Sequence, residues 1–242
     1  LKNKVIVITG GSGLIGKEII SKLKKEGATV INLDITLSDN IDNGEINCNI
    51  SDEDSVLGAI KKIESRYSKI YGWINNAYPR TSDWNTEFEE ISYDSWKNNI
   101  DLHLNGYFLC SQKILKKMRL QREGSLINMA SIYGVVGPNF SLYKDIPKMT
   151  MPAAYSAIKG GIISLTKYLA SYYGEYNVRV NCVSPGGVFD NQNEKFVRRY
   201  VDKVPMQRMA NAEEIADSII FLLKSSYITG HNLIVDGGLT IT

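Results

Sequence analysis

The sequence has 242 residues, of which 43% are hydrophobic and 22% charged, and its formal net charge is +2. This size and composition predict one α/β domain over residues 1–242 with a large buried core. A net charge so close to zero argues against nucleic acid or an anionic membrane as partner, and no apolar run reaches the ~20 residues that span a bilayer. The first residues enter a strand at once, so we expect no signal peptide.

The cysteines and histidines give no sign of a disulfide framework or a metal site. Cys48, Cys110 and Cys182 are far apart, and each lies in an apolar segment. This pattern indicates reduced core residues of a cytoplasmic protein. His103 and His231 are the only histidines, and with so few soft ligands we expect no metal.

A βαβ unit opens the chain. Residues 4–10 form a continuous apolar run, which is typical of a strand buried on both faces. The sequence TGGSGLIG follows, then an amphipathic helix to about residue 26 and a second apolar strand that ends at Asp34. Glycines in such a turn let the backbone approach a pyrophosphate, whose charge the helix N-terminus favours. We therefore expect a dinucleotide to be bound by Gly10, Ser12, Gly13, Leu14, Ile15 and Gly16.

Asp34 indicates which dinucleotide is bound. It lies about twenty residues after the glycine motif, where a carboxylate accepts hydrogen bonds from a ribose 2′-hydroxyl and repels a 2′-phosphate. No Arg or Lys follows it immediately, so the sequence favours NAD over NADP. A third short strand ends near Asn49 and Ile50, which we expect to flank the adenine. Ser51 is the predicted N-cap of the next helix, which runs to about residue 67.

The middle of the chain places polar residues at predicted strand ends. A strand over residues 69–77 ends in Asn75-Asn76-Ala77, and Ser131 ends the next strand. Polar groups at the carboxyl ends of parallel strands lie where such sheets bind ligands, so Asn76 and Ser131 are candidate site residues. One long helix, over residues 92–118, is predicted between these strands, and it carries His103.

Tyr155 and Lys159, in the sequence YSAIK, lie in a predicted helix over residues 153–173. Residues i and i+4 share a helix face, so the phenol and the ammonium project together. The positive charge is expected to lower the pKa of the phenol, which could then exchange a proton with a hydroxyl or carbonyl group. Tyr93 and Lys97 have the same spacing, and for either pair the alternative is a solvated helix face.

The rest of the chain completes an alternating pattern. Residues 132–152 form a long irregular loop, and residues 188–210 form a charged, mobile segment that could act as a lid. A strand over 178–187, a helix over 212–223 and a strand over 231–238 follow. Because strands alternate with helices throughout, we predict a single-domain, doubly wound (Rossmann) parallel sheet of about seven strands flanked by helices.

The ordered set of motifs resembles the short-chain dehydrogenase/reductase family, in its single-domain form, over nearly the whole chain. In family order, the set comprises the glycine turn, Asn75-Asn76-Ala77, Ser131, Tyr155, Lys159, Asn181 to Gly186 and Asp236-Gly237-Gly238. This order separates the two Tyr-Lys pairs, because Tyr155 follows the strand that ends in Ser131, as the family's catalytic tyrosine does. Tyr93 lies where the family has no catalytic group.

The resemblance implies a role for each matching residue. Tyr155 would be the general acid/base, and Ser131 would hydrogen-bond the reacting oxygen. Lys159 would hold the nicotinamide ribose and lower the pKa of Tyr155. Asn76 would contact the cofactor, and the backbone near Val188 would meet its carboxamide.

Four departures from the family pattern concern the site. His103 stands where the family's helix carries an asparagine; it could hold a water, titrate, or be only a packed residue of an inactive homologue. A shift that brings Asn105 into this role is disfavoured, because i and i+2 face different ways on a helix. Tyr78 replaces a glycine after Asn-Asn-Ala, and the TGxxGxxG turn is that of the sugar-nucleotide epimerase branch. The loop between Ser131 and Tyr155 is longer than usual, and it could select substrate or contact another subunit.

We therefore expect an NAD(H)-dependent oxidoreductase that interconverts a secondary alcohol and a ketone. Arg80, Trp84, Lys144 and Lys148 near the expected mouth favour a polar, anionic small molecule as substrate. The long loop resembles a subgroup linked to bacterial surface and flagellar glycan biosynthesis, and this resemblance implies a sugar-derived substrate. Two alternatives stay open: an epimerase or dehydratase of a nucleotide sugar that uses NAD only transiently, and a non-catalytic NAD-binding protein.

The helices predicted over 92–118 and 153–175 carry more apolar surface than one sheet can cover. Members of the family pair these helices, so the resemblance implies a homotetramer or a homodimer.

Overall fold

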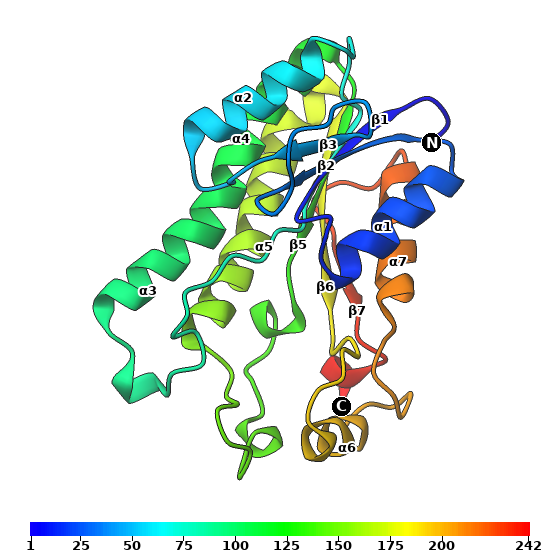
Figure 1. The fold of residues 1–242 in the computed structure, drawn as a ribbon. Coiled ribbons are helices and arrows are strands. Elements are labelled where there is room, and N and C mark those ends of the chain that lie inside the picture. The colour runs from blue at the N-terminus through cyan, green and yellow to red at the C-terminus, as the bar shows by residue number, and fades with distance from the viewer.

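Seven parallel strands form one sheet in the order β3-β2-β1-β4-β5-β6-β7 in this computed structural model, which describes residues 1–242 (Figure 1). The strands are β1 (Val5–Thr9), β2 (Thr29–Asp34), β3 (Glu45–Asn47), β4 (Gly72–Asn75), β5 (Gly124–Met129), β6 (Val178–Pro185) and β7 (Asn232–Val235). The order of the strands reverses between β1 and β4, and doubly wound sheets bind ligands at the carboxyl ends beside such a reversal. The predicted fold is confirmed.

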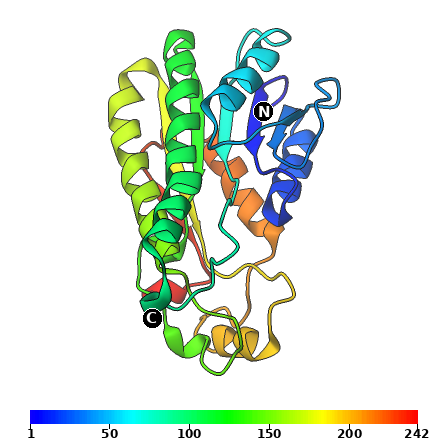
Figure 2. The same ribbon diagram turned by 60° about the vertical axis from the view of Figure 1, so that its left-hand side comes forward.

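Helices cover both faces of this sheet (Figures 1 and 2). α1 and α7 pack together on one face, and α2, α4 and α5 lie side by side on the other. The helices are α1 (Leu14–Lys25), α2 (Glu53–Glu64), α3 (Tyr93–Ile100), α4 (Gly106–Gln121), α5 (Ala153–Tyr173), α6 (Glu194–Val201) and α7 (Ala212–Lys224). None of them combines the length and the apolar character that a membrane span requires.

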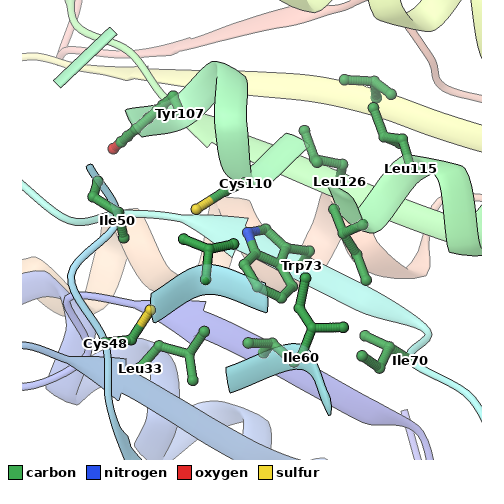
Figure 3. Packing of buried hydrophobic residues seen from close by; sticks show 14 of the residues in the cluster. Leu33, Cys48, Ile50, Ile60, Ile70, Trp73, Tyr107, Cys110, Leu115 and Leu126 are labelled. Carbon is green, nitrogen blue, oxygen red and sulfur yellow. The ribbon is translucent and has the colours of Figure 1, made fainter. Parts of the chain in front are cut away.

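Side chains that alternate along the strands fill the two layers between sheet and helices. In β1, Ile8 belongs to the apolar cluster under α1 and α7, whereas Val7 belongs to the cluster under α2, α4 and α5. Trp73 of β4 lies in the second cluster, among aliphatic side chains from β2, α2, α4 and β5 (Figure 3). Its indole Nε1 donates to Asn75 Oδ1 at 2.8 Å, so its polar atom is satisfied in the core. Because helices cover both faces of these strands, their sequences are continuously apolar. This is the pattern from which the strands were predicted.

The start of α2 differs from the expectation. Its N-cap is Asp52, whose Oδ1 accepts a hydrogen bond from the backbone N–H of Ser55 at 2.8 Å. Ser51, the predicted cap, instead donates its hydroxyl to Asn49 Oδ1 at 2.8 Å. Both residue types cap helices well, but a carboxylate also interacts favourably with the helix dipole, which favours Asp52.

The helix predicted over residues 92–118 is interrupted. A π-helical segment, Asp101–Asn105, joins α3 to α4, and α4 continues to Gln121. His103 lies in this segment and is completely buried. A single π-helical turn shifts the spacing of apolar residues by only one position, so the sequence pattern does not reveal this segment. Such turns occur frequently at functional sites.

Two less regular segments gather at the carboxyl end of the sheet. The loop of residues 132–152 and the segment that carries α6 lie side by side there in both views, close to the C-terminus (Figures 1 and 2). The loop includes two 3₁₀ turns, Ile132–Gly134 and Phe140–Leu142. The two segments predicted to be irregular or mobile are thus partly ordered, and they border the site described next.

Candidate active site

The glycine turn after β1 packs too closely against backbone for side chains at Gly10 and Gly16. Gly10 has a φ of +65°, and a Cβ there would lie 2.6 Å from the Cα of Ala77. A Cβ on Gly16 would lie 2.6 Å from the carbonyl oxygen of Gly10. The glycines therefore let α1 start close against β1 and β4, which leaves its N-terminal N–H groups directed at the groove above.

Asp34 ends β2 beside this turn. Its carboxylate accepts hydrogen bonds from Ser12 N at 3.1 Å, Thr36 N at 3.0 Å and the Thr36 hydroxyl at 2.8 Å. Burial opposes ionisation, but the hydrogen bonds from Thr36 and Ser12 outweigh it and lower the pKa of Asp34. The side chain is thus an anion at neutral pH, held in place at the edge of the groove.

One groove of about 820 Å³ runs along the carboxyl ends of the strands and collects every predicted cofactor residue. These residues are Gly10, Ser12, Gly13, Leu14, Ile15, Gly16, Asp34, Asn49, Ile50, Asn76, Tyr155, Lys159 and Val188. A glycine cradle at a helix N-terminus suits a pyrophosphate, and a fixed carboxylate at the next strand end suits a ribose diol. The groove therefore fits a nicotinamide dinucleotide.

Asn76 also holds the groove together. Its Nδ2 donates to the carbonyl oxygens of Gly10 at 2.8 Å and Thr9 at 3.2 Å. The Thr9 hydroxyl in turn accepts from the N–H groups of Asn76 at 3.0 Å and Ala77 at 3.1 Å. These bonds tie the end of β4 to the glycine turn, a structural role beside the predicted contact with the cofactor.

Tyr155 and Lys159 line one end of this groove, and the Lys159 amine lies 5.5 Å from the centroid of the Tyr155 ring. The Ser131 hydroxyl lies close enough to the Tyr155 phenol to influence its pKa. Burial raises the pKa of Tyr155, and the nearby Ser131 hydroxyl only partly opposes this. The expected net lowering by Lys159 is not found, because Lys159 is itself buried and its own pKa falls to about 7.

His103 lies directly behind Lys159. Its Nε2 is 3.3 Å from Lys159 Nζ, which also donates to the carbonyl oxygen of Met129 at 2.7 Å. Burial and the nearby Lys159 charge hold the pKa of His103 well below its usual value, so the imidazole is neutral. Its Nδ1 is buried without a hydrogen-bond partner. Packing alone would favour an apolar side chain here, since such an atom costs about 1–3 kcal/mol.

Aromatic rings enclose Tyr155. Tyr78, which replaces the family's glycine, meets the Tyr155 ring edge-on at 5.8 Å and the Trp84 ring at 5.9 Å. Trp84, expected at the mouth, is buried and contacts Tyr155 at 6.2 Å between ring centroids. Arg80 is exposed and covers the Tyr78 face at 4.9 Å, on the rim of the groove. Tyr78, which was expected to narrow the mouth of the pocket, therefore carries the Arg80 guanidinium on its outer side.

The second Tyr-Lys pair is a solvated helix face. Tyr93 is exposed at the start of α3, and Lys97 forms an ion pair with Asp94 at 3.1 Å. Neither residue lines the groove. Lys144 and Lys148 are exposed on the loop of residues 132–152 and line a separate cavity within it.

Several residues that shape the site were missed in the sequence. Thr36 holds Asp34, and Asn32 accepts from Gly11 N at 2.9 Å through Oδ1, which fixes the turn. Tyr133 and Tyr143 meet through their hydroxyls at 3.3 Å near Ser131. Thr36 carries a signal, because Asp followed two residues later by Thr is a common local hydrogen-bonding pattern. The tyrosine pair carries none, since its members are joined only by the fold.

Comparison with known proteins finds relatives that match nearly the whole chain. A sequence profile described as Enoyl-(Acyl carrier protein) reductase matches residues 12–240. The chain is 34% identical to post-translational flagellin modification protein A of Campylobacter coli, over 98% of both chains. It is 32% identical to the 3-oxoacyl-acyl-carrier-protein reductase FabG of Thermotoga maritima, over 100% of this chain and 99% of that one.

A solved structure agrees closely with the whole fold. The crystal structure of a short chain dehydrogenase from Leptospira borgpetersenii with bound NAD+ superposes with a TM-score of 0.89 at 34% identity. The match covers 99% of this chain and 94% of the other.

Proposed function

The chain belongs to the short-chain dehydrogenase/reductase family, and from its site we propose that it is an NAD(H)-dependent oxidoreductase that interconverts a secondary alcohol and a ketone. One observation carries this proposal. A single groove combines a dinucleotide cradle with Tyr155 and Lys159, and the Ser131 hydroxyl lies close to the Tyr155 phenol.

Each of the three residues has a distinct task. The Tyr155 phenolate takes the proton of the substrate hydroxyl during oxidation, and the phenol returns it during reduction. Ser131 hydrogen-bonds the same oxygen, and Lys159 stabilises the phenolate while its own amine is protonated, which is the case below about pH 7. Bound NAD would supply the hydride acceptor.

Asp34 supports NAD over NADP. Its fixed carboxylate offers acceptors to a ribose diol, and its charge opposes a 2′-phosphate. We expect calorimetry to give at least tenfold tighter binding of NAD+ than of NADP+, a difference of about 1.4 kcal/mol. Asp34→Ala should abolish most of this preference. Tighter wild-type binding of NADP+ would refute the assignment.

A polar, sugar-derived substrate is supported by the polar side chains of Arg80, Asp190 and Gln192, which line the groove. The proposed test supplies sugar phosphates, nucleotide sugars and CMP-linked acids together with NAD+ and follows NADH by absorbance. Tyr155→Phe should lower kcat by about 10²–10⁴-fold with NAD+ binding intact. Tyr93→Phe, from the solvated pair, is the matched control and should behave as wild type.

The same assay separates the alternatives. Conversion of a nucleotide sugar without accumulation of NADH would indicate an epimerase or dehydratase. Equal activity of Tyr155→Phe and wild type would contradict the catalytic role of the phenol. Binding of NAD+ without turnover of any supplied substrate class would favour a non-catalytic protein.

We also propose a homotetramer or homodimer, supported by aromatic side chains exposed on α4 and α5, among them Phe108 and Tyr168. The three cysteines are free and buried, which suits a reducing compartment, so we propose a cytoplasmic location.

A further inference from the structure

The loop of residues 132–152 and the segment of α6 form one packed unit over the catalytic end of the groove. They share an apolar cluster that is separate from the two layers of the main core. The buried members of this cluster are Leu142, Tyr143, Ile146, Phe196, Tyr200, Val204 and Met209. The rings of Tyr143 and Phe196 are 5.4 Å apart, which joins the loop directly to α6.

Arg199 ties the same two segments together with polar contacts. From α6, its Nη1 donates to the backbone carbonyl oxygens of Ser141 and Leu142, each at 3.4 Å, and to that of Lys144. These carbonyls flank Tyr143, so the guanidinium fixes the backbone that carries this side chain. The position of the Tyr143 hydroxyl is therefore set by α6 as well as by the loop.

The Tyr143 hydroxyl lies against that of Tyr133, at 3.3 Å. Tyr133 follows Ser131 by two residues, and its backbone N–H donates to the Ser131 hydroxyl at 3.2 Å. The phenols of Tyr133 and Tyr155 are close enough to interact electrostatically, as are those of Tyr143 and Tyr155. The pair of hydroxyls is thus linked to the catalytic residues through Ser131, whose hydroxyl accepts from the backbone of Tyr133.

The two hydroxyls cannot satisfy all of their hydrogen-bonding groups with each other. A phenol has one hydrogen to donate and lone pairs to accept, and the two hydroxyls share a single hydrogen bond. One O–H hydrogen and several lone pairs are left for another molecule. A partner that both donates and accepts matches them, whereas an acyl chain would leave them unpaired in a buried site.

Space for such a molecule adjoins Tyr133, while Tyr143 lines the neighbouring cavity within the loop. A cavity of about 960 Å³ is lined by Tyr133 and by the apolar edge of the loop and the α6 segment. Its other polar side chains are those of Asn139, Asp202, Lys203, Gln207, Thr240 and Thr242. Amides, carboxylates and hydroxyls are donors and acceptors suited to a molecule with many hydroxyl groups.

We propose that the hydroxyl pair of Tyr133 and Tyr143 is the specificity element of the substrate site and selects a polyhydroxylated substrate, a saccharide or its derivative, over an acyl chain. The inference rests on the proposed oxidoreductase function and deepens it. A site built to hydrogen-bond a hydroxyl rejects analogues that lack one by large factors, because its own polar groups are then left unpaired. The loop between Ser131 and Tyr155 exists, on this account, to deliver Tyr143.

Binding to the protein–NADH complex tests the inference without requiring turnover. Saturation-transfer NMR titrations would use N-acetyl-D-glucosamine, D-glucose 6-phosphate and acetoacetyl-CoA as probes. We expect at least one saccharide to bind. Tyr133→Phe and Tyr143→Phe should each weaken its binding about tenfold, the equivalent of one hydrogen bond. NADH affinity should be unchanged, and Tyr227→Phe, at a fully exposed tyrosine, is the matched control.

The double variant sharpens the test. Because the two hydroxyls act as one unit, Tyr133→Phe with Tyr143→Phe should lose less than the product of the two single losses. Three results would each overturn the inference: no saccharide binding to wild type, saccharide binding unchanged in both single variants, or tighter binding of acetoacetyl-CoA. Equal activity of Tyr155→Phe and wild type in the separate turnover assay would instead refute the proposed function.

Discussion

Lys159 is the residue whose charge changes near neutral pH. Burial lowers its pKa to about 7, while burial and the charge of Lys159 keep His103 neutral. The groups that face Lys159 are His103, Tyr155, Tyr78 and Tyr107 within 6 Å, together with Cys182. None of these groups carries a full negative charge that would raise the pKa of Lys159 back to its usual value. The sequence left open whether His103 titrates; in the structure its pKa lies well below the usual value, whereas that of Lys159 falls to about 7.

The first prediction concerns His103 and the pH dependence of the rate. In wild type the lysine loses its proton as the pH rises through about 7, so the pH–rate profile should have a limb there. His103→Asn keeps an acceptor for the ammonium, so the limb should stay in place. His103→Leu removes that acceptor, and the limb should move down by about one to two pH units, the equivalent of a charged hydrogen bond of about 1.5–3 kcal/mol.

Thermal melting provides a control that needs no substrate. An unfolded lysine keeps its proton to high pH, whereas folded Lys159 releases it near 7, so between these values the unfolded chain binds more protons and stability rises with pH. This rise should begin at lower pH in His103→Leu. An identical limb and an identical melting profile in wild type and His103→Leu would show that His103 only packs.

At the residue scale, spacing and strand ends pointed to Gly10, Asp34, Tyr155 and Lys159, which the structure brings together in one groove. The direction of the Tyr155 pKa was not predictable, because it depends on burial that only the folded chain defines.

At the scale of elements, apolar runs predicted the central strands and the amphipathic pattern predicted α5. The π-helical segment Asp101–Asn105 and the cap at Asp52 were not predicted. Both involve a shift of one residue, to which periodicity is insensitive. α6 was also missed, because its helix is stabilised mainly by packing against the loop of residues 132–152, to which the sequence gives no pointer.

The second prediction tests this dependence of loop on helix. Arg199→Ala removes the donor that holds the carbonyls of Ser141, Leu142 and Lys144. Hydrogen exchange of the amides in residues 140–149 should accelerate about tenfold, while exchange in the core strands stays unchanged. Arg198→Ala, at the exposed neighbour with no side-chain hydrogen bond, is the control and should match wild type. Equal protection of the loop in Arg199→Ala and Arg198→Ala would contradict the role of the guanidinium.

At the scale of the whole molecule, alternation of strands and helices was enough to predict the doubly wound sheet and the end at which its site lies. What the alternation could not predict is the third apolar cluster, since it joins residues near 142 to residues near 200 without a strand or a periodic pattern between them. The same limit applies to the outer surface, where the sequence marks α4 and α5 as apolar but does not say what covers them.

The third prediction is that a second copy of the chain covers this surface. Phe108 on α4 is 49% exposed, and Tyr168 and Tyr172 on α5 are 63% and 51% exposed. The two helices lie side by side on the outer face (Figures 1 and 2), and exposed aromatic groups gathered in this way are typical of subunit contacts.

Light scattering at micromolar concentration should give two or four times the 27.1 kDa of one chain. Phe108→Glu or Tyr168→Glu should reduce this mass, because each buries a charge in the contact. Phe88→Glu, at an exposed ring in the segment before α3 and on neither helix, should not. A monomeric wild type would contradict the prediction, and so would an unchanged mass in both glutamate variants.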